Sequence, residues 1–166
     1  MNIQKNKKNL EKKLINNLNS INIKSISAKE INFFHNKTVL ITGVSGIIGL
    51  NLLFFFYKIS KEKKIKITID GTYNSHLFNF VKKYFDKNKK INFIKIDLST
   101  NKIKSNKKYD LIFHCAGYGQ PSKFLKFKTS TYKLNSNTIM DLSNRLKKNG
   151  IFIYMSSTEI YSGNKK

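Results

Sequence analysis

Apolar and polar positions follow a regular order from Lys37 to the end of the chain, where short apolar runs alternate with longer amphipathic stretches. Short apolar runs between turn residues are typical of buried strands, and apolar residues spaced three and four apart are typical of helices. The expected strands are residues 38–42, 65–69, 91–96, 109–115 and 151–156, and the expected helices are residues 47–60, 76–85 and 129–148. Strands separated by right-handed crossovers pair in parallel, so this order predicts an α/β fold with a doubly wound parallel sheet.

Residues 1–36 differ in composition, because they are rich in Lys and Asn. They carry four apolar residues at helical spacing, Leu10, Leu14, Ile15 and Leu18. This pattern predicts a helical N-terminal extension that packs loosely on the following domain through a linker. Contact of this helix with a membrane surface is the minor alternative. We therefore expect two regions, an extension at 1–36 and a domain at 37–166.

Composition adds a strong positive charge to this picture. The 166 residues carry a formal net charge of +23, but of the 32 basic residues only Arg145 is an arginine. Base recognition and bidentate phosphate contacts favour the planar guanidinium, and the lysines are scattered along every segment. We expect no specific nucleic-acid partner.

The cellular location is predicted from the absence of a membrane span and of a secretion signal in the sequence. The longest run, residues 47–57, is shorter than a bilayer span and contains Asn51, and no secretion signal opens the chain. The single cysteine, Cys115, has no partner for a disulfide or for a metal knuckle. These features predict a cytoplasmic protein with no membrane partner and no metal site.

A glycine-rich turn carries the strongest chemical signal. Thr42 and the residues that follow it read T-G-V-S-G-I-I-G, directly after a predicted strand and at the start of an apolar helix. Glycines at such a turn let the backbone approach a pyrophosphate, and the helix N-terminus offers free N–H groups to the anion. A turn without ligand is the alternative, and a P-loop is excluded because no Gly-Lys-Ser/Thr follows. The candidate cofactor-binding residues of this turn are Gly43, Ser45, Gly46, Ile47, Ile48 and Gly49.

The turn resembles the start of the extended short-chain dehydrogenase/reductases, the NAD-dependent epimerase/dehydratase family, whose signature begins T-G-x-x-G-x-x-G. Asp97 after the third strand is similar to the family residue that binds the adenine amino group, although an Asp there is also a common turn cap. The segment from His114 to Gly117 is similar to the H-x-A-G/A stretch beside the cofactor. The resemblance implies these further cofactor contacts: Asp97, Leu98, Cys115, Ala116, Gly117 and Asn135.

The last predicted strand leads into S-S-T-E-I-Y-S-G, which resembles the family segment S-[ST]-x-E-V-Y-G. The resemblance implies a cofactor contact at Ser156, substrate orientation by Ser157, and acid/base roles for Thr158 and Glu159. Dehydratases often carry Asp where Thr158 stands, and a surface carboxylate is the alternative for Glu159. Residues 117–124 resemble a sugar-site loop of UDP-glucuronate decarboxylase-like members, with a plain loop as an equal alternative.

Two features depart from the family pattern. The ribose-binding carboxylate belongs roughly 20 residues beyond the glycines, whereas Asp70 follows the expected strand at 65–69 directly and could extend it. Tyr73 or Asn74 would then occupy the ribose-facing position, so NAD is the expected cofactor and NADP stays open. The catalytic Tyr-x-x-x-Lys belongs on a later helix, and the pair Tyr161 and Lys165 matches it by chance. The substrate-binding C-terminal part is therefore expected to be missing.

Together these features predict a Rossmann-like sheet of strand order 3-2-1-4-5. By resemblance, the chain is the NAD-binding part of a sugar-nucleotide epimerase, dehydratase (dTDP-glucose dehydratase-like) or decarboxylase, which acts by transient hydride transfer at a sugar carbon. Its expected partners are a nucleotide-sugar substrate and, in the full-length enzyme, a second copy. The alternative function is a non-catalytic nucleotide-binding or redox-sensing module.

Overall fold

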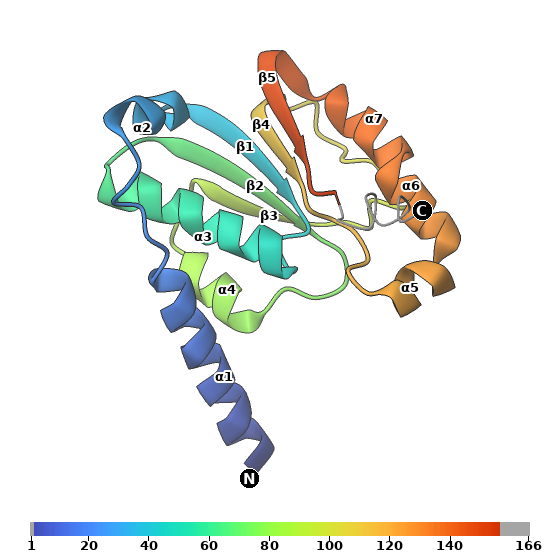
Figure 1. The fold of residues 1–166 in the computed structure, drawn as a ribbon, viewed down its shortest axis with the longest axis horizontal. Helices are drawn as coiled ribbons and strands as arrows, with labels where there is room; N and C mark the ends of the chain where they lie inside the picture. The colour runs from blue at the N-terminus through green and yellow to red at the C-terminus, as the bar shows by residue number, and fades with distance from the viewer. Residues whose placement is uncertain (1, 157–166) are drawn as a thin grey trace, which may run out of the picture.

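A five-stranded parallel sheet forms the centre of the computed structural model, which describes residues 2–156 (Figure 1). Its strands are β1 (Lys37–Thr42), β2 (Ile67–Tyr73), β3 (Ile91–Lys95), β4 (Tyr109–His114) and β5 (Leu146–Tyr154). They lie in the order β3-β2-β1-β4-β5. The predicted Rossmann-like sheet and its strand order are confirmed.

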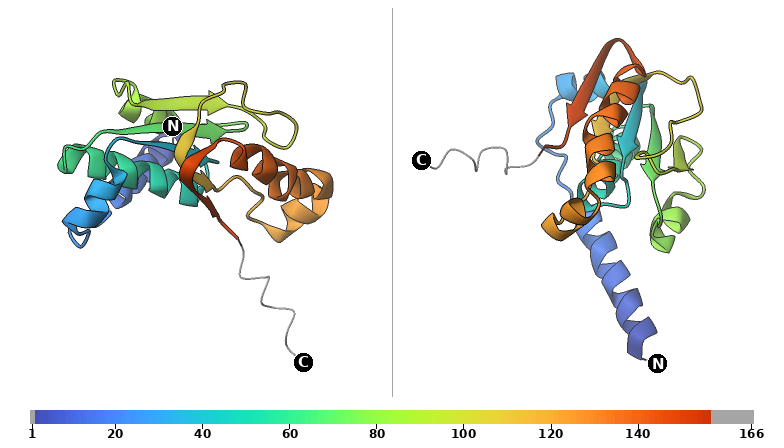
Figure 2. Two further views of the ribbon diagram at one scale, coloured as in Figure 1. Left: turned by 90° about the horizontal axis from the view of Figure 1, so that it is seen from above. Right: turned by 90° about the vertical axis from the view of Figure 1, so that its right-hand side faces the viewer.

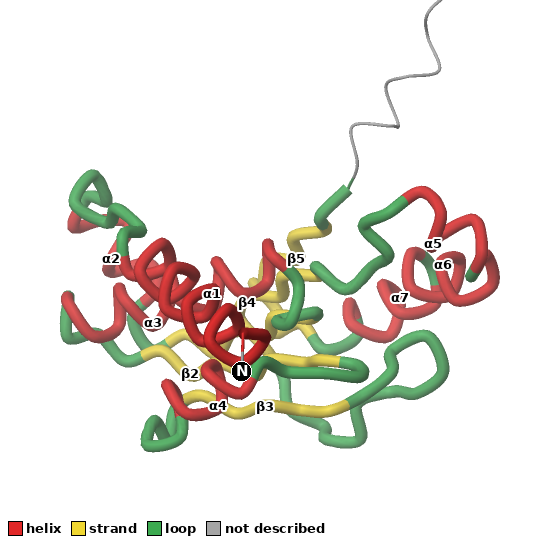
Figure 3. Tube along the Cα trace, turned by 90° about the horizontal axis from the view of Figure 1, so that it is seen from below, coloured by secondary structure: helices red, strands yellow, loops and turns green. Residues whose placement is uncertain are grey.

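Helices cover both faces of this sheet. They are α1 (Asn2–Asn19), α2 (Ala28–Phe34), α3 (Ile47–Glu62), α4 (Asn79–Phe85), α5 (Pro121–Lys126), α6 (Lys128–Asn135) and α7 (Asn137–Ser143). Figure 3 shows α5, α6 and α7 grouped together, apart from α1 to α4. None of the described helices combines the length and apolar character that crossing a membrane requires.

The central strand β1 is buried on both faces, because successive side chains point to opposite sides of a sheet. Val39 and Ile41 belong to the core formed with α3 and α4, whereas Leu40 belongs to the core formed with α6 and α7. All three are fully buried. The two cores fix the register of β1, and with it the position of the turn that follows.

The predicted single helix at residues 129–148 is wrong. The structure interrupts it at Ser136, whose backbone leaves helical geometry (φ −132°, ψ −76°). The Ser136 hydroxyl donates to the carbonyl of Tyr132 at 2.6 Å and stands between Asn135 and Asn137. Such side chains compete with the helical backbone for hydrogen bonds. The second helix ends at Ser143, and β5 begins five residues earlier than expected.

Two short helices were also missed, because residues at their N-termini rather than apolar periodicity specify them. A capping box between Ser27 and Glu30 starts α2 within the expected linker. Pro121 stands at the first helical positions of α5, within the expected loop. The connection at residues 97–108 contains no helix, as its polar sequence predicts.

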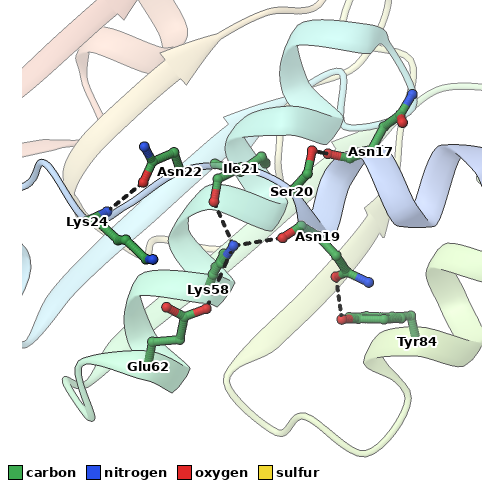
Figure 4. Close-up of polar contacts among 9 residues, drawn as sticks. All are labelled: Asn17, Asn19, Ser20, Ile21, Asn22, Lys24, Lys58, Glu62 and Tyr84. Atoms are coloured by element: carbon green, nitrogen blue, oxygen red, sulfur yellow. Dashed lines mark hydrogen bonds and ion pairs between the residues drawn. The ribbon is translucent and has the colours of Figure 1, made fainter.

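The N-terminal helix α1 is attached by its carboxyl end and points away from the sheet at its other end (Figure 2). Lys58 on α3 donates to the carbonyls of Asn19 and Ile21 at 2.7 and 2.6 Å, and so satisfies acceptors that the helix end leaves open (Figure 4). Leu18 and Ile23 on either side of this contact are 2% exposed. The extension is therefore anchored tightly at this end, in contrast to the loose packing expected.

Candidate functional site

A cavity of about 260 Å³ lies at the carboxyl ends of β1, β2 and β4. In open parallel sheets this edge is where ligands bind. Of the residues singled out in the sequence, those that line it are Gly43, Ser45, Gly46, Asp97, Leu98, Cys115, Ala116 and Gly117. The other lining residues are Thr72, Tyr73, Asn74, Ile96, Tyr118 and Leu134. Tyr73 and Asn74 are the two candidates for the ribose-facing position. Leu134 lies on α6, and only the tertiary fold brings it to the cavity.

Two glycines allow the turn after β1 to fit against its neighbours. Gly43 has a φ of +69°, and a Cβ there would lie 2.9 Å from the Ala116 backbone. A Cβ on Gly49 would lie 2.4 Å from the carbonyl oxygen of Gly43. These contacts exclude a side chain at either position, so the sequence spacing G-x-x-G-x-x-G reflects close backbone packing.

Gly46 is less closely packed than these two glycines. It is exposed and begins α3, and a Cβ there would meet only the Gly43 oxygen, at 3.3 Å. No side chain caps the first turn of α3, so the N–H groups at this helix end stay available to an anion.

The side chains of several predicted contacts do not line the cavity. Ile47 and Ile48 point outward and are 78% and 49% exposed, and Gly49 is buried beneath the turn. Asn135 is exposed at the end of α6, and its neighbour Leu134 lines the cavity instead. Ser156 is exposed just beyond β5. The predicted Ser157, Thr158 and Glu159, and the pair Tyr161 and Lys165, lie outside the described residues.

A buried hydrogen-bond network joins β1 to β4 below the cavity. His114 lies 2.9 Å from the carbonyl oxygen of Leu134 through Nε2 and 2.7 Å from the Thr42 hydroxyl through Nδ1. A carbonyl only accepts, so Nε2 carries the proton and Thr42 donates to Nδ1. The Thr42 oxygen in turn accepts from the backbone N–H groups of Cys115 and Ala116, both at 3.1 Å. This network holds the segment after β4 against the glycine turn.

Burial sets the protonation of two residues in this region. It lowers the pKa of His114, with partial compensation by the bond to Leu134, so the imidazole is neutral in the folded chain. Burial also raises the pKa of the Cys115 thiol to about 11. The cysteine is therefore a protonated, partly buried apolar group and a poor nucleophile at neutral pH.

The His114 shift predicts that stability falls with acidification. The folded pKa is below the unfolded value of 6.5, so unfolded chains bind the extra proton. This contribution is complete above about pH 6.5 and decreases as the pH falls towards the folded pKa. Urea midpoints measured between about pH 7.5 and about pH 5.5 should decrease in the wild type and decrease less in His114→Gln. Equal slopes in the two proteins would contradict the assignment.

Asp97 performs the turn-capping role and still lines the cavity. Its Oδ1 accepts from the Ser99 backbone N–H at 2.9 Å and from the Ser99 hydroxyl at 2.7 Å. None of the described residues donates a hydrogen bond to the second carboxylate oxygen, Oδ2. The cap therefore leaves one carboxylate oxygen for a ligand.

Asp70 lies inside β2 and away from the cavity, 3% exposed. Its Oδ2 accepts from the hydroxyl of Tyr109 at 2.7 Å and pairs with the ammonium of Lys107 at 2.8 Å. The end of β2 instead brings Tyr73 and Asn74 to the cavity.

A parallel sheet of order 3-2-1-4-5 with a glycine turn after its first strand defines a Rossmann-like protein. The model of the NAD dependent epimerase/dehydratase family matches residues 39–166, and the chain belongs to this family. A search of curated proteins gives no match.

Solved structures with the same fold come from larger proteins. Epimerase Mth375 from Methanothermobacter thermautotrophicus matches with a TM-score of 0.59 and 19% identity, over 82% of this chain and 40% of its own. Pen from Bacillus thuringiensis matches with a TM-score of 0.56 and 20% identity, over 75% of this chain and 39% of its own. WbmF from Bordetella bronchiseptica, in complex with NAD+ and UDP, matches with a TM-score of 0.53 and 17% identity. The match covers 81% of this chain and 40% of WbmF. The chain spans about two fifths of these proteins.

Proposed function

We propose that the cavity at the sheet edge binds a nicotinamide adenine dinucleotide, and that the chain is the cofactor-binding part of an enzyme that acts on nucleotide sugars. The observation that carries this proposal is the shared lining of one cavity by Gly43, Gly46, Asp97 and Ala116. These residues come from three separate segments of the chain. Each supplies what one part of the cofactor needs.

The residues fit the cofactor part by part. Gly43 and Gly46 let the pyrophosphate approach the uncapped first turn of α3, where free N–H groups and the helix dipole favour an anion. The open Oδ2 of Asp97 would accept a hydrogen bond from the adenine amino group. The small residues Ala116 and Gly117 leave room for the chain of the cofactor. When bound, the nicotinamide supplies the hydride acceptor.

The proposed substrate is a nucleotide sugar, oxidised transiently at a sugar carbon. WbmF, which shares the fold, holds NAD+ and UDP together. In the chain, His114 and Tyr154 are partners where β4 and β5 end, so the residues after β5 start from the edge that carries the cavity. We propose that Ser157 orients the sugar hydroxyl there and that Thr158 and Glu159 serve in acid/base steps.

Substitution of Gly46 tests the cofactor site with little disturbance of the fold. A valine there fills the space in front of the first turn of α3 and should weaken binding of the dinucleotide at least tenfold by calorimetry. The unfolding midpoint should fall less than in a Gly49→Val variant, because the new Cβ meets one backbone atom, the Gly43 oxygen at 3.3 Å, which has to shift by only a few tenths of an ångström.

Gly119→Val is the matched control, since a Cβ at that loop position meets nothing within 4 Å and the residue does not line the cavity. Its affinity should equal that of the wild type. Undiminished binding by a folded Gly46→Val variant would refute the proposed pyrophosphate site.

A further inference from the structure

The adenosine end of the proposed cofactor site has no carboxylate at the end of β2. NAD-selective sites place an acidic residue there, which accepts from the ribose 2′-hydroxyl and disfavours a 2′-phosphate, whereas a cation nearby accommodates that phosphate. The three residues of this segment that line the cavity, Thr72, Tyr73 and Asn74, are all neutral. The carboxylate of Asp70, the one acidic residue of β2, is already bound by Tyr109 and Lys107.

Two lysines flank this neutral strand end. Tyr73 is the register partner of Lys95 on β3, and the Lys82 ammonium on α4 lies 6.0 Å from the centroid of the Tyr73 ring. Both lysines are exposed, and neither pairs with a carboxylate among the described residues. Two lysines without a carboxylate partner among the described residues therefore lie near Tyr73.

The positive field extends beyond these two side chains. A second cavity, of about 870 Å³, shares Asn74, Ile96 and Asp97 with the first, and Lys95 is among its lining residues. Five more lysines line it, Lys89, Lys90, Lys102, Lys104 and Lys107, of which Lys102 pairs with Asp141 and Lys107 with Asp70. Asp97 faces both cavities, but its proposed partner is the adenine rather than the ribose.

From this arrangement we infer that the site prefers NADP(H) to NAD(H), with Lys82, Lys95 and the Asn74 amide receiving the 2′-phosphate. The inference rests on the proposed function and specifies the cofactor it uses. A phosphate monoester carries close to two negative charges at neutral pH, and lysine binds it as a mobile point charge. The added attraction has no counterpart for the 2′-hydroxyl of NAD(H).

Calorimetric titration of the whole chain with NADPH and with NADH tests this preference. NADPH should bind at least tenfold more tightly at low salt, and the ratio should decrease as ionic strength rises. In the double variant Lys82→Glu, Lys95→Glu the ratio should fall to one or below while NADH affinity stays within about threefold. Asn74→Asp, which restores a carboxylate at the strand end, should favour NADH.

The matched control is the double variant Lys83→Glu, Lys87→Glu, which makes the same charge change on and just after α4 at exposed positions. It should keep most of the NADPH preference. Equal or tighter binding of NADH by the unaltered chain would overturn the inference and leave the proposed function standing. A preference that persists in the Lys82, Lys95 variant would overturn the assignment of these residues, and binding of neither cofactor would refute the proposed function as well.

Discussion

Replacing Gly49 with valine is expected to destabilise the chain by more than about 3 kcal/mol, at or beyond the upper end of ordinary overpacking. The new Cβ would lie 2.4 Å from the Gly43 oxygen, 2.9 Å from the Gly43 carbonyl carbon and 3.0 Å from the Val44 Cα. All three are backbone atoms, so no flexible side chain can move aside. Helix α3 would have to shift, and with it the buried Leu53 and Phe56.

Urea unfolding followed by circular dichroism measures this effect. A loss of that size removes a large part of the stability of an ordinary small domain, so much of the variant is expected to be unfolded or insoluble. Gly46→Val, three positions earlier, should lose less stability, because its Cβ would meet one backbone atom at 3.3 Å rather than three at 3.0 Å or less. A Gly49→Val midpoint equal to that of Gly46→Val would show that the backbone contact is not tight.

The second large effect is expected from Thr42→Val. The valine keeps the shape of the threonine but leaves Nδ1 of His114 and the backbone N–H groups of Cys115 and Ala116 without their partner. Each buried polar group without a partner costs about 1–3 kcal/mol, and partial relaxation gives an expected total of about 2–4 kcal/mol. Cofactor affinity should fall too, because Cys115 and Ala116 line the cavity.

Thr42→Ser is the matched control for this substitution. It keeps the hydroxyl and removes one methyl group, so it should cost about 1 kcal/mol and retain binding. Equal unfolding free energies for the valine and serine variants would show that packing, and not the hydrogen-bond network, explains the role of Thr42.

Gly49→Val and Thr42→Val both disturb the packing of the glycine turn after β1. Gly43 has no side chain, so the turn after β1 can contact the segment after β4, and Gly49 has none, so α3 can pack against that turn. Thr42 supplies the hydrogen bonds that hold the turn and the segment after β4 together. The cavity walls are thereby fixed by backbone contacts rather than by flexible side chains. A site held in this way is preorganised for its ligand.

The chain's own sequence determined its sheet order and the place of its glycine turn. Both depend on local patterns, namely the alternation of strands and helices and a short spacing of glycines between them. The family resemblance indicated Asp97, Ala116 and Gly117 as cofactor contacts, and all three line the cavity just beyond strand ends. The local patterns did not predict the break at Ser136, which depends on side-chain hydrogen bonds that apolar periodicity does not record.

The tertiary structure alone decided which polar groups become partners. Thr42 and His114 are 72 residues apart, and Asp70 and Tyr109 are 39 apart, yet each pair shares a buried hydrogen bond. Burial keeps His114 neutral, and its bonds determine which ring nitrogen carries the proton. The bonds to Tyr109 and Lys107 make Asp70 unavailable to a ribose. A buried polar group must find a partner wherever the fold brings one, and that choice depends on the packing of several strands together, which no local stretch of sequence specifies.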